Sequence, residues 1–434
     1  MRIAVVGSGI SGLASAWLLS RRHEVVLFEA SNYLGGHTHT HDIDLVGRRY
    51  RVDTGFIVHN PVHYPLLTRM FDELGVATKP TTMSFSMHSE ASGVEYNATS
   101  LDGLFCQRRN LLSPRFWRML CDLRRFYRLA PRLLETADPG PTLADYLQEH
   151  GFGEAFRDEH LLPMASALWS SPSAQVLSFP ARYLVQFMAN HHMLQVSGRP
   201  DWRVVRAGSA SYVDALQRHW NASVRLRTPV YSVRRDADGV EIASEDGSER
   251  FDHVVLACHS DQALALLADA DAREAGILGA IPYQANDVVL HTDARLLPPN
   301  RKAWAAWNAH VPRDPTHACT VSYCMNLLQG IDAPQPLVVT LNRTHAIDPS
   351  CILRRMAYSH PVYTHASVAA QSRRSVIQGQ RRTWFAGAYW GWGFHEDGIR
   401  SAVEVARALG VHWDASPVAS ANQREMPLAQ AVPA

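Results

Sequence analysis

The sequence predicts an α/β fold with two domains, one of them assembled from separate stretches of the chain. Three observations predict it. A buried-strand pattern, a glycine-rich turn and a helical pattern follow one another at the N-terminus. Further strand patterns and glycine-rich turns return much later, near residues 224–258 and 384–398. The chain has 434 residues, enough for two or three domains and a large buried core.

The composition is that of an ordinary soluble globular enzyme. Hydrophobic residues make up 46% of the chain, charged residues 19%, and the formal net charge is +1. A net charge so close to zero provides no global field for nucleic acid, so we expect no nucleic-acid partner. Six scattered cysteines without a C-x-x-C pair argue against a disulfide framework or a zinc site and fit a reducing cytosol. We expect no signal peptide and no transmembrane helix, and therefore a cytoplasmic protein.

The N-terminal stretch carries a dinucleotide-binding pattern. Residues 3–6 form an apolar run typical of a buried parallel strand, and residues 24–28 predict the next strand. Between them, Gly7, Gly9 and Gly12 have G-x-G-x-x-G spacing. Gly7 permits a tight turn, Gly9 permits close approach to a pyrophosphate, and Gly12 permits close packing of helix on strand.

Neighbouring residues complete this Rossmann-like pattern. The helix N-terminus directs unpaired N–H groups and a partial positive charge toward phosphates. Glu29 ends the second strand, 17 residues after Gly12, where its carboxylate can accept hydrogen bonds from an adenosine ribose. We expect Ile10, Ser11 and Ala30, which adjoin these positions, to contact the dinucleotide as well.

The segment after the second strand distinguishes NAD from FAD. Gly35 and Gly36 form a G-G turn, and Asp53 and Gly55 follow in "YRVDTGF". Here the sequence resembles the flavin amine oxidase and phytoene desaturase superfamily, in which a G-G turn, a strand and a D-x-G element meet the flavin. Most members have arginine after the G-G pair, where this chain has His37. The resemblance implies FAD as the cofactor. The neighbouring residues that it assigns to FAD are His37, Thr38, Thr54 and Phe56.

Two later strands fit the same superfamily. "RLRTPVYSVRR" looks like the strand whose backbone, near Val230, meets the adenine. "FDHVVLACHS" looks like the strand that returns beneath the cofactor and ends at Ala257 and Cys258. The resemblance runs from residue 1 to about residue 412 and is strongest at its two ends.

The stretch "WFAGAYWGWGFHEDGIRSA" is similar to the C-terminal flavin motif of that superfamily. Residues 384–386 predict a strand and Gly387 the turn that leaves it, while Gly398 lies near the start of an amphipathic helix that Gly410 closes. A helix N-terminus aimed at the flavin would stabilise the negative charge that reduction places near N1 and the C2 carbonyl. The flavin contacts expected here come from Gly387, Ala388, Tyr389, Phe394, His395, Glu396, Asp397 and Gly398.

The resemblance implies an amine-oxidase-like arrangement of two domains. The Rossmann-like FAD-binding domain is expected to be discontinuous, with residues 1–80, 203–285 and 376–412. An α+β substrate domain fills residues 81–202 and 286–375 and is mostly helical in its first part. Residues 413–434 are rich in proline, alanine and small polar residues, which predicts a disordered tail.

Several strings are more specific than the superfamily. "VDTGFIVHN", "RRNLLSPRFWRML", "YSHPVYT" and the C-terminal motif together resemble bacterial FAD-dependent oxidoreductases that accompany cyclopropane-fatty-acyl-phospholipid synthases. That resemblance implies oxidation or desaturation of a fatty-acyl or phospholipid-linked substrate by hydride transfer to flavin N5, and a lipid methyltransferase as a partner. The alternative within the superfamily is an amine or a carotenoid-type polyene as substrate. The alternative of another class is a non-catalytic flavin-binding partner of a lipid methyltransferase.

A basic segment favours a lipid partner. Ser113 and Pro114 form a helix N-cap and first helical position. Four apolar residues share one helix face, with three arginines elsewhere: Phe116, Leu120, Leu123 and Tyr127, and Arg118, Arg125 and Arg128. Such a helix can lie on anionic lipid, which predicts peripheral contact with the inner face of the membrane. The alternative is a solvated face on a substrate-domain helix.

Four residues are candidates for catalysis. His59 and His395 lie in segments expected near the flavin and could act as bases near neutral pH, as could His63. Lys302, in "NRKAWAAWN", resembles a lysine of amine oxidases that holds a water at flavin N5.

A group of alternating histidines could in principle bind metal. His37, His39 and His41 would share one face of a strand, because side chains alternate there. No carboxylate or cysteine partner is evident, so we expect no metal site.

Overall fold

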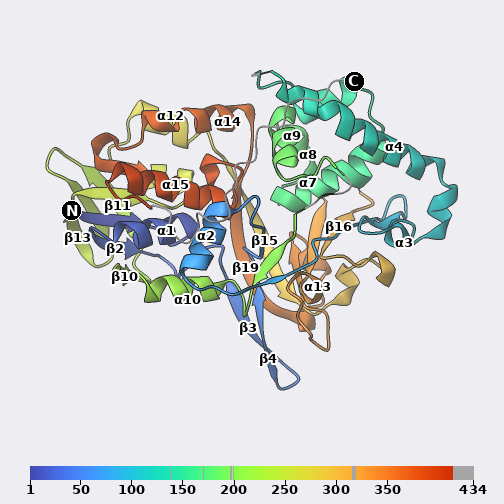
Figure 1. Ribbon diagram of the computed structural model, residues 1–434, viewed down its shortest axis with the longest axis horizontal. Helices are drawn as coiled ribbons and strands as arrows, with labels where there is room; N and C mark the ends of the chain where they lie inside the picture. The colour runs from blue at the N-terminus through green and yellow to red at the C-terminus, as the bar shows by residue number, and fades with distance from the viewer. Residues whose placement is uncertain (137, 170, 196–197, 199, 315–318, 414–434) are drawn as a thin grey trace, which may run out of the picture.

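The computed structural model describes residues 1–136, 138–169, 171–195, 198, 200–314 and 319–413. Figure 1 shows two bodies that are joined by several chain segments. The body that holds the N-terminus contains a parallel sheet, and the other contains a larger sheet with helices beyond it. The predicted disordered tail lies outside the described residues, apart from Trp413. In the described part of the chain, no helix is both long and apolar enough to span a bilayer.

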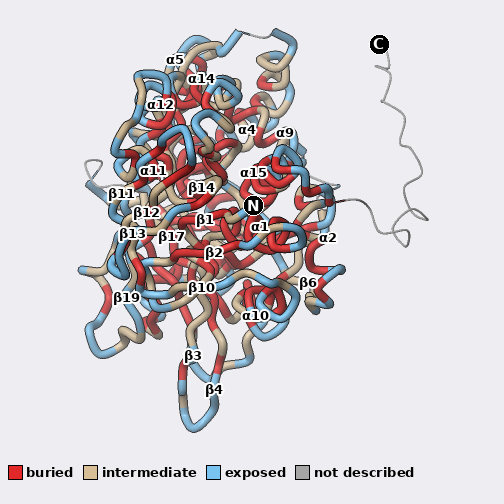
Figure 2. Tube along the Cα trace, turned by 90° about the vertical axis from the view of Figure 1, so that its left-hand side faces the viewer, coloured by how far each residue is buried: buried red, intermediate tan, exposed pale blue. Residues whose placement is uncertain are grey.

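A five-stranded parallel sheet forms the centre of the first body. Its order is β10-β2-β1-β14-β20. The strands are β1 (Arg2–Val6), β2 (Glu24–Phe28), β10 (Ser223–Arg225), β14 (His253–Leu256) and β20 (Thr383–Phe385). Figure 2 shows its central strands as buried. β1 and β2 lie where the apolar runs predict them.

Two layers cover this sheet because side chains alternate along each strand. Ile3 and Val5 of β1 pack with helices of one layer, and Ala4 and Val6 pack with the other layer. The first layer contains α1 (Ile10–Leu19), α10 (Ala210–Arg218) and α15 (His395–Ala408). The second contains β11 (Val230–Arg235), β12 (Val240–Ser244), β13 (Gly247–Phe251), α11 (Ser260–Leu266) and α12 (Ala272–Leu278).

The register of the parallel strands aligns their carboxyl ends. Val6 pairs with Phe28 on one side and with Leu256 on the other, and Leu256 pairs with Phe385. The segments that leave β1, β2, β14 and β20 therefore meet at one edge, which is where α/β sheets bind ligands.

The second body is built on a seven-stranded sheet in the order β19-β15-β18-β17-β16-β7-β8. Its strands are β7 (Phe85–Ser89), β8 (Glu95–Asn97), β15 (Tyr283–His291), β16 (Trp307–Val311), β17 (Thr320–Cys324), β18 (Val338–Leu341) and β19 (Ile352–Pro361). Only the pair β16–β7 is parallel. β15 begins at Tyr283, slightly before residue 286, where the substrate domain was predicted to resume.

Helices and small sheets complete the molecule. The helices are α2 (Pro65–Glu73), α3 (Leu101–Leu104), α4 (Pro114–Leu129), α5 (Leu143–Glu149), α6 (Glu154–Phe156), α7 (Leu162–Trp169), α8 (Ser173–Leu177), α9 (Ala181–Asn190), α13 (Met325–Leu328) and α14 (His365–Ser372). The remaining strands are β3 (Thr40–Leu45) and β4 (Arg48–Asp53), which form a hairpin, and β5 (Val58–His59), β6 (Thr78–Pro80) and β9 (Arg203–Val205).

Helix α4 starts as predicted but buries a different face. The Ser113 hydroxyl accepts a hydrogen bond from the Phe116 N–H at 3.3 Å. The buried apolar residues of α4 are Phe116, Met119 and Phe126. They are buried because α4 packs against α6 and against the short 3-10 helix Ala130–Leu134 that directly follows α4. The other three residues of the predicted face, Leu120, Leu123 and Tyr127, are only partly buried. Arg125 does not face solvent freely, because its guanidinium donates to the His150 carbonyl and stacks on Phe152.

Candidate functional site

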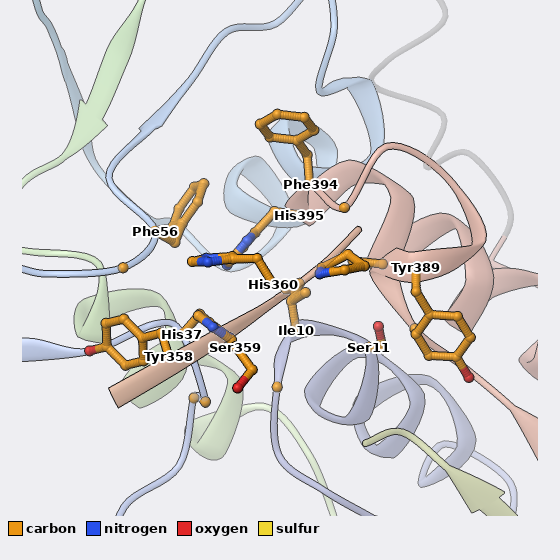
Figure 3. Close-up of a pocket in the computed structure, with 18 of the residues that line it drawn as sticks. Ile10, Ser11, His37, Phe56, Tyr358, Ser359, His360, Tyr389, Phe394 and His395 are labelled. Carbon is orange, nitrogen blue, oxygen red and sulfur yellow. The ribbon is translucent and has the colours of Figure 1, made fainter. Parts of the chain in front are cut away.

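A cavity of about 1020 Å³ begins at the carboxyl ends of the parallel strands and reaches the seven-stranded sheet. Residues from both bodies line it, including the first turn of α1, the Gly35–Gly36 turn, β19 and the start of α15. Figure 3 labels ten of these residues, among them Ile10 and Ser11 from the first turn of α1 and Tyr358, Ser359 and His360 from β19.

A cradle for phosphate groups lies where β1 passes into α1. Gly7 has a φ of +97°, a conformation that residues with a side chain rarely adopt. Gly9 is the N-cap of α1, and no side chain caps that helix end. A Cβ atom on Gly9 would meet nothing within 4 Å, and one on Gly36 would lie 3.1 Å from the Gly9 Cα. The N–H groups of the first turn of α1 therefore face open space, as an anion-binding helix end requires.

Glu29 lies beside this cradle. Its Oε2 accepts hydrogen bonds from the Ser8 N–H at 2.8 Å and the Ser8 hydroxyl at 2.6 Å, and its Oε1 accepts from the Ser31 N–H at 2.8 Å. A carboxylate has about four acceptor positions, so one remains for a ribose hydroxyl. The uncapped helix, the empty space at Gly9 and this carboxylate fit a dinucleotide such as FAD.

Most residues assigned to FAD from the sequence line the cavity. They are Gly7, Gly9, Ile10, Ser11, Glu29, Ala30, Gly35, Gly36, His37, Thr54, Gly55, Phe56, Val230, Ala257, Cys258, Gly387, Ala388, Tyr389, Phe394 and His395. They come from both ends and the middle of the chain, and the aligned carboxyl ends of the parallel strands bring them together.

Three of the assigned residues lie behind the lining in the N-terminal half. A Cβ atom on Gly12 would lie 1.9 Å from the Gly7 oxygen, so Gly12 serves helix packing. The Thr38 hydroxyl bonds to His395. The buried Asp53 carboxylate accepts from Ser209, Thr40 and Gln329, and burial is the main reason that its pKa is raised to about 6.

The other three, Glu396, Asp397 and Gly398, lie in the first turn of α15. They were predicted to contact the flavin, and the structure places them differently. Glu396 caps α2, because its two carboxylate oxygens accept from the Leu66 and Leu67 N–H groups, each at 3.0 Å. Asp397 accepts from the Trp392 and Phe394 N–H groups. Gly398 lies against α1 and does not line the cavity. Of the residues at this helix start, only Phe394 and His395 reach the cavity.

His395 is held rigidly in the cavity wall. Its Nε2 lies 3.0 Å from the Thr38 hydroxyl and 3.1 Å from the Tyr212 hydroxyl, and these two hydroxyls bond to each other. Its ring stacks on Phe56 with the centroids 3.7 Å apart. Burial lowers the pKa of His395 to about 3, so the imidazole is neutral at physiological pH.

The other three catalytic candidates lie outside the cavity lining. Lys302 is a surface residue whose side chain is 60% exposed and pairs with Asp102 at 3.4 Å, so it cannot hold a water inside the cavity. His59 is buried against Phe71 and does not line the cavity. His63 stacks on His191 instead of reaching the cavity itself.

The alternating histidines lie on one side only in part. His39 and His41 lie together, with their ring centroids 3.9 Å apart, but β3 begins at Thr40 and His37 turns away from them. His37 faces the cavity with His259 and His360, whereas His39 stacks on Tyr33. No group of three or more potential metal ligands occurs in the ranges that the structure describes.

A second part of the cavity was not predicted from the sequence. We call it the apolar lobe; its residues are Ile57, Met83, Ala167, Leu168, Trp169, Val288, Trp307, Tyr323, Leu328 and Leu341. Val288 pairs with Leu341 and Trp307 with Tyr323, so these four side chains lie on one face of the seven-stranded sheet. α7 covers that face, and the Tyr323 hydroxyl donates to the Ala167 carbonyl at 3.1 Å. The only sequence signal was an alternating apolar pattern, which any half-buried strand shows.

The lining carries very little formal charge. Among the described residues that line the cavity, none is lysine or arginine, and the acidic residues are Glu29 and Asp201. Glu29 lies at the dinucleotide end, and Asp201 is exposed. The apolar lobe itself has no ionisable acid or base among its described residues, apart from the hydrogen-bonded phenol of Tyr323.

Comparisons with known proteins agree with this geometry. The family model described as flavin containing amine oxidoreductase matches residues 10–301. The carotenoid phi-ring synthase of Streptomyces griseus is 26% identical over 278 residues, which cover 59% of this chain and 52% of that protein. The chain thus aligns with about half the length of that curated relative.

Solved structures share the whole fold. A conjugated-linoleic-acid-producing fatty acid isomerase from P. acnes superposes with a TM-score of 0.66 at 18% identity, covering 94% of this chain and 98% of the other. Cyclohexylamine oxidase from Brevibacterium oxydans superposes with a TM-score of 0.66 at 17% identity, covering 94% of this chain and 99% of the other. The predicted α/β fold with an amine-oxidase-like FAD-binding architecture is confirmed.

Proposed function

The chain belongs to the family of flavin-containing amine oxidoreductases, which are FAD-dependent enzymes, and from this membership we propose that it oxidises a C–H bond in an uncharged acyl chain of a lipid. The product would carry a new carbon–carbon double bond. The observation that carries the proposal is the apolar lobe, which opens from the dinucleotide end of the cavity and has no charged partner for an ionised substrate.

The charge of the substrate distinguishes an amine, a free fatty acid and a neutral acyl chain from one another. An amine is protonated near neutral pH, and burying an ammonium group without a carboxylate partner costs several kcal/mol. A free carboxylate would need arginine or lysine, which is absent from the described lining. A neutral chain needs neither, and burial of each CH₂ group in the apolar lobe contributes about 0.8 kcal/mol.

The similar proteins act on different kinds of molecule by name: they include a fatty acid isomerase, a carotenoid phi-ring synthase, cyclohexylamine oxidase and putrescine oxidase. The first two are named for apolar molecules and the last two for amines. The cavity lining of this chain favours an apolar substrate over an amine.

When bound, FAD supplies the hydride acceptor at flavin N5. The chain supplies position and exclusion of water. Phe56 and His395 form a flat stacked wall, and Phe394 stacks on Phe187 with the centroids 5.3 Å apart. A substrate bound there would give a hydride from one carbon to the cofactor and a proton from the next carbon to water, and dioxygen or a quinone would afterwards take up the two electrons. The Thr38 and Tyr212 hydroxyls hold His395 in this wall, so we assign it to orient the reacting chain.

Anaerobic reduction of the enzyme-bound flavin tests the proposal. We expect a saturated or monounsaturated phospholipid to bleach the flavin absorbance, and mass spectrometry of the lipid to show the loss of two hydrogens. Bleaching by cyclohexylamine alone would establish an amine oxidase, and bleaching by a polyene alone a carotenoid-type enzyme. A failure of every candidate to bleach the flavin would favour the non-catalytic alternative.

A variant of the apolar lobe makes the test specific. Ala167→Phe fills the space between α7 and the sheet, so reduction by long acyl chains should fall at least tenfold while FAD content is unchanged. Ala270→Phe is the matched control, because Ala270 is exposed and does not line the cavity. An equal rate in Ala167→Phe and wild type would place the substrate elsewhere.

We further propose that the enzyme takes its substrate at an anionic membrane surface. The exposed side of α4 and the turn before it form a patch that we call the α4 surface: Leu111, Leu112, Trp117, Arg118, Arg124 and Arg128. Leu112 is 88% exposed and Trp117 46% exposed, which is unusual for large apolar residues. Apolar residues next to arginines suit the boundary between acyl chains and anionic headgroups. A lipid methyltransferase that modifies the same acyl chains is the partner that this proposal implies.

A further inference from the structure

The dinucleotide end of the cavity lacks the positive charge that its cofactor needs. The diphosphate of FAD brings two negative charges, and the carboxylate of Glu29 adds a third. Among the described lining residues there is no lysine or arginine to balance them. The N-terminus of α1 contributes about half a unit of positive charge, which is too little by itself. An unbalanced buried charge costs several kcal/mol, so a further positive charge beside the cradle would strengthen FAD binding.

Three histidines lie beside the phosphate cradle. His37 directly follows Gly36, which packs on Gly9. His259 follows Cys258, whose backbone nitrogen lies 3.2 Å from the position of a Cβ atom on Gly7. His360 comes from β19 in the other body.

Their rings form a group. The ring centroid of His37 is 5.2 Å from that of His360 and 6.1 Å from that of His259. All three histidines line the cavity (Figure 3 labels His37 and His360).

We propose that His37, His259 and His360 form a histidine cluster that balances the diphosphate of FAD and takes up protons when the cofactor binds. The cluster would hold the charge that a single arginine would otherwise provide, and would hold it only while the cofactor is present.

One hydrogen-bonding atom without a partner among the described residues supports this role. The Nε2 of His37 is buried and has no hydrogen-bond partner among the described residues. The Nδ1 of His360 accepts a hydrogen bond from the Asn286 side-chain amide nitrogen at 3.0 Å, and His259 stacks on Tyr283 with the centroids 4.4 Å apart. A neutral imidazole donates at one nitrogen only, whereas an imidazolium donates at both. Protonation of His37 therefore lets both of its ring nitrogens donate at the site where we expect the phosphate oxygens.

In the absence of FAD, the groups around the histidine cluster determine its charge. His37 faces Tyr358 and His360 from β19, His259 from α11 and His395 from α15. Burial, followed by repulsion among the histidines, lowers the pKa of His37 well below its usual value and that of His360 to about 4. Burial also lowers the pKa of His259, which Asp261 partly opposes. The Cys258 thiol is neutral, because burial raises its pKa, and Glu29 is the remaining acid nearby.

The direction of the pH dependence follows from these states. Without FAD the cluster is neutral at pH 7, because its pKa values lie below the usual histidine value. A dianion at short range favours the imidazolium and raises those pKa values in the complex. The complex then binds more protons than the free protein, so affinity for FAD rises as pH falls, by about tenfold per pH unit for each proton taken up.

Calorimetric titration of the full-length apoprotein measures this directly. FAD is titrated between about pH 6 and about pH 8.5, the range in which histidine charge responds to its surroundings, in buffers of different ionisation enthalpy. We expect uptake of one or more protons and a dissociation constant that decreases toward low pH. ADP-ribose carries the same diphosphate without the flavin and should show the same uptake. Riboflavin has no phosphate and should show none.

Variants assign the protons to residues. His37→Gln and His360→Gln should each reduce proton uptake and flatten the pH dependence. His37→Arg supplies a permanent charge and should keep tight binding with less pH dependence. His41→Gln is the matched control, because burial also lowers the pKa of His41 to about 4 and its side chain does not line the cavity.

Two results would overturn the proposal. One is FAD binding without proton uptake and with a pH-independent dissociation constant. The other is unchanged proton uptake in both glutamine variants. The protons would then be bound by another group, such as Asp53, whose pKa is about 6. Because the readout is cofactor binding, neither result bears on which substrate the enzyme oxidises.

Discussion

A Cβ atom on Gly398 would lie 2.6 Å from the Cγ2 of Ile10, so α15 rests on the first turn of α1 with no room for a side chain. The two helices come from opposite ends of the chain, and their contact lies directly behind the phosphate cradle. Gly398 therefore acts on the cofactor through α1 and not by touching the flavin.

Gly398→Ala should weaken FAD binding by displacing the first turn of α1. The added methyl group must move Ile10 or Ser11, and overpacking of this kind typically costs 1–3 kcal/mol of folding stability. Chemical unfolding and FAD titration of the same sample check both effects. Gly276→Ala in α12 is the control, because nothing lies within 4 Å of its Cβ position, and it should be neutral or stabilising by up to about 1 kcal/mol.

Gly9→Val and Gly12→Val should fail in different ways. A side chain on Gly9 enters open cavity space, so the protein should fold but lose FAD. A Cβ atom on Gly12 would lie 1.9 Å from the Gly7 oxygen, so that variant should lose folding stability as well. Thermal unfolding without FAD separates the two outcomes. Full FAD content in Gly9→Val would contradict the placement of the phosphates.

Glu29→Ala should weaken FAD binding by about 1–3 kcal/mol, the cost of losing a hydrogen bond to a charged acceptor. The change also frees the Ser8 N–H, so thermal unfolding of the apoprotein serves as a control for the loop itself. FMN lacks the adenosine ribose, and its affinity should be the same in wild type and variant. An equal loss for FMN and FAD would remove the ribose from this position.

The apoprotein should become less stable as pH falls below about 6.5. His395 is neutral in the fold with a pKa of about 3, while the unfolded chain has the usual histidine value near 6.5. The unfolded state therefore binds the extra proton, and stability is lost at up to about 1.4 kcal/mol per pH unit across this window. Urea unfolding at several pH values measures the slope. His395→Gln should reduce that slope, and an unchanged slope would mean that His395 is charged in the fold.

Arg118, Arg124 and Arg128 changed together to glutamate should reduce sedimentation with anionic liposomes at low salt, where surface electrostatics are strongest. These three arginines are exposed and do not line the cavity, so their loss should leave FAD content intact. Arg218, Arg234 and Arg355, exposed on other elements, changed together to glutamate form the charge-matched control. If both triple variants lose binding equally, the α4 surface has no special role.

The sequence by itself determined the N-terminal strand, turn and helix that form the predicted dinucleotide-binding site. Gly7, Gly9, Gly12 and Glu29 are close in the chain, and their roles follow from local backbone geometry at the end of one strand. A strand, a turn and a helix start are decided within a few residues, so β1, β2 and α1 lie where the sequence predicts them.

Only the tertiary structure decided which side chains reach the cavity. Glu396 and Asp397 follow His395 directly, yet one caps α2 and the other ties down the preceding loop. Lys302 matches a sequence pattern but pairs with Asp102 at the surface. The apolar lobe and the histidine cluster join residues from distant strands. Contacts of this kind depend on sheet register and on packing between layers, which link residues hundreds of positions apart and leave no mark in local sequence.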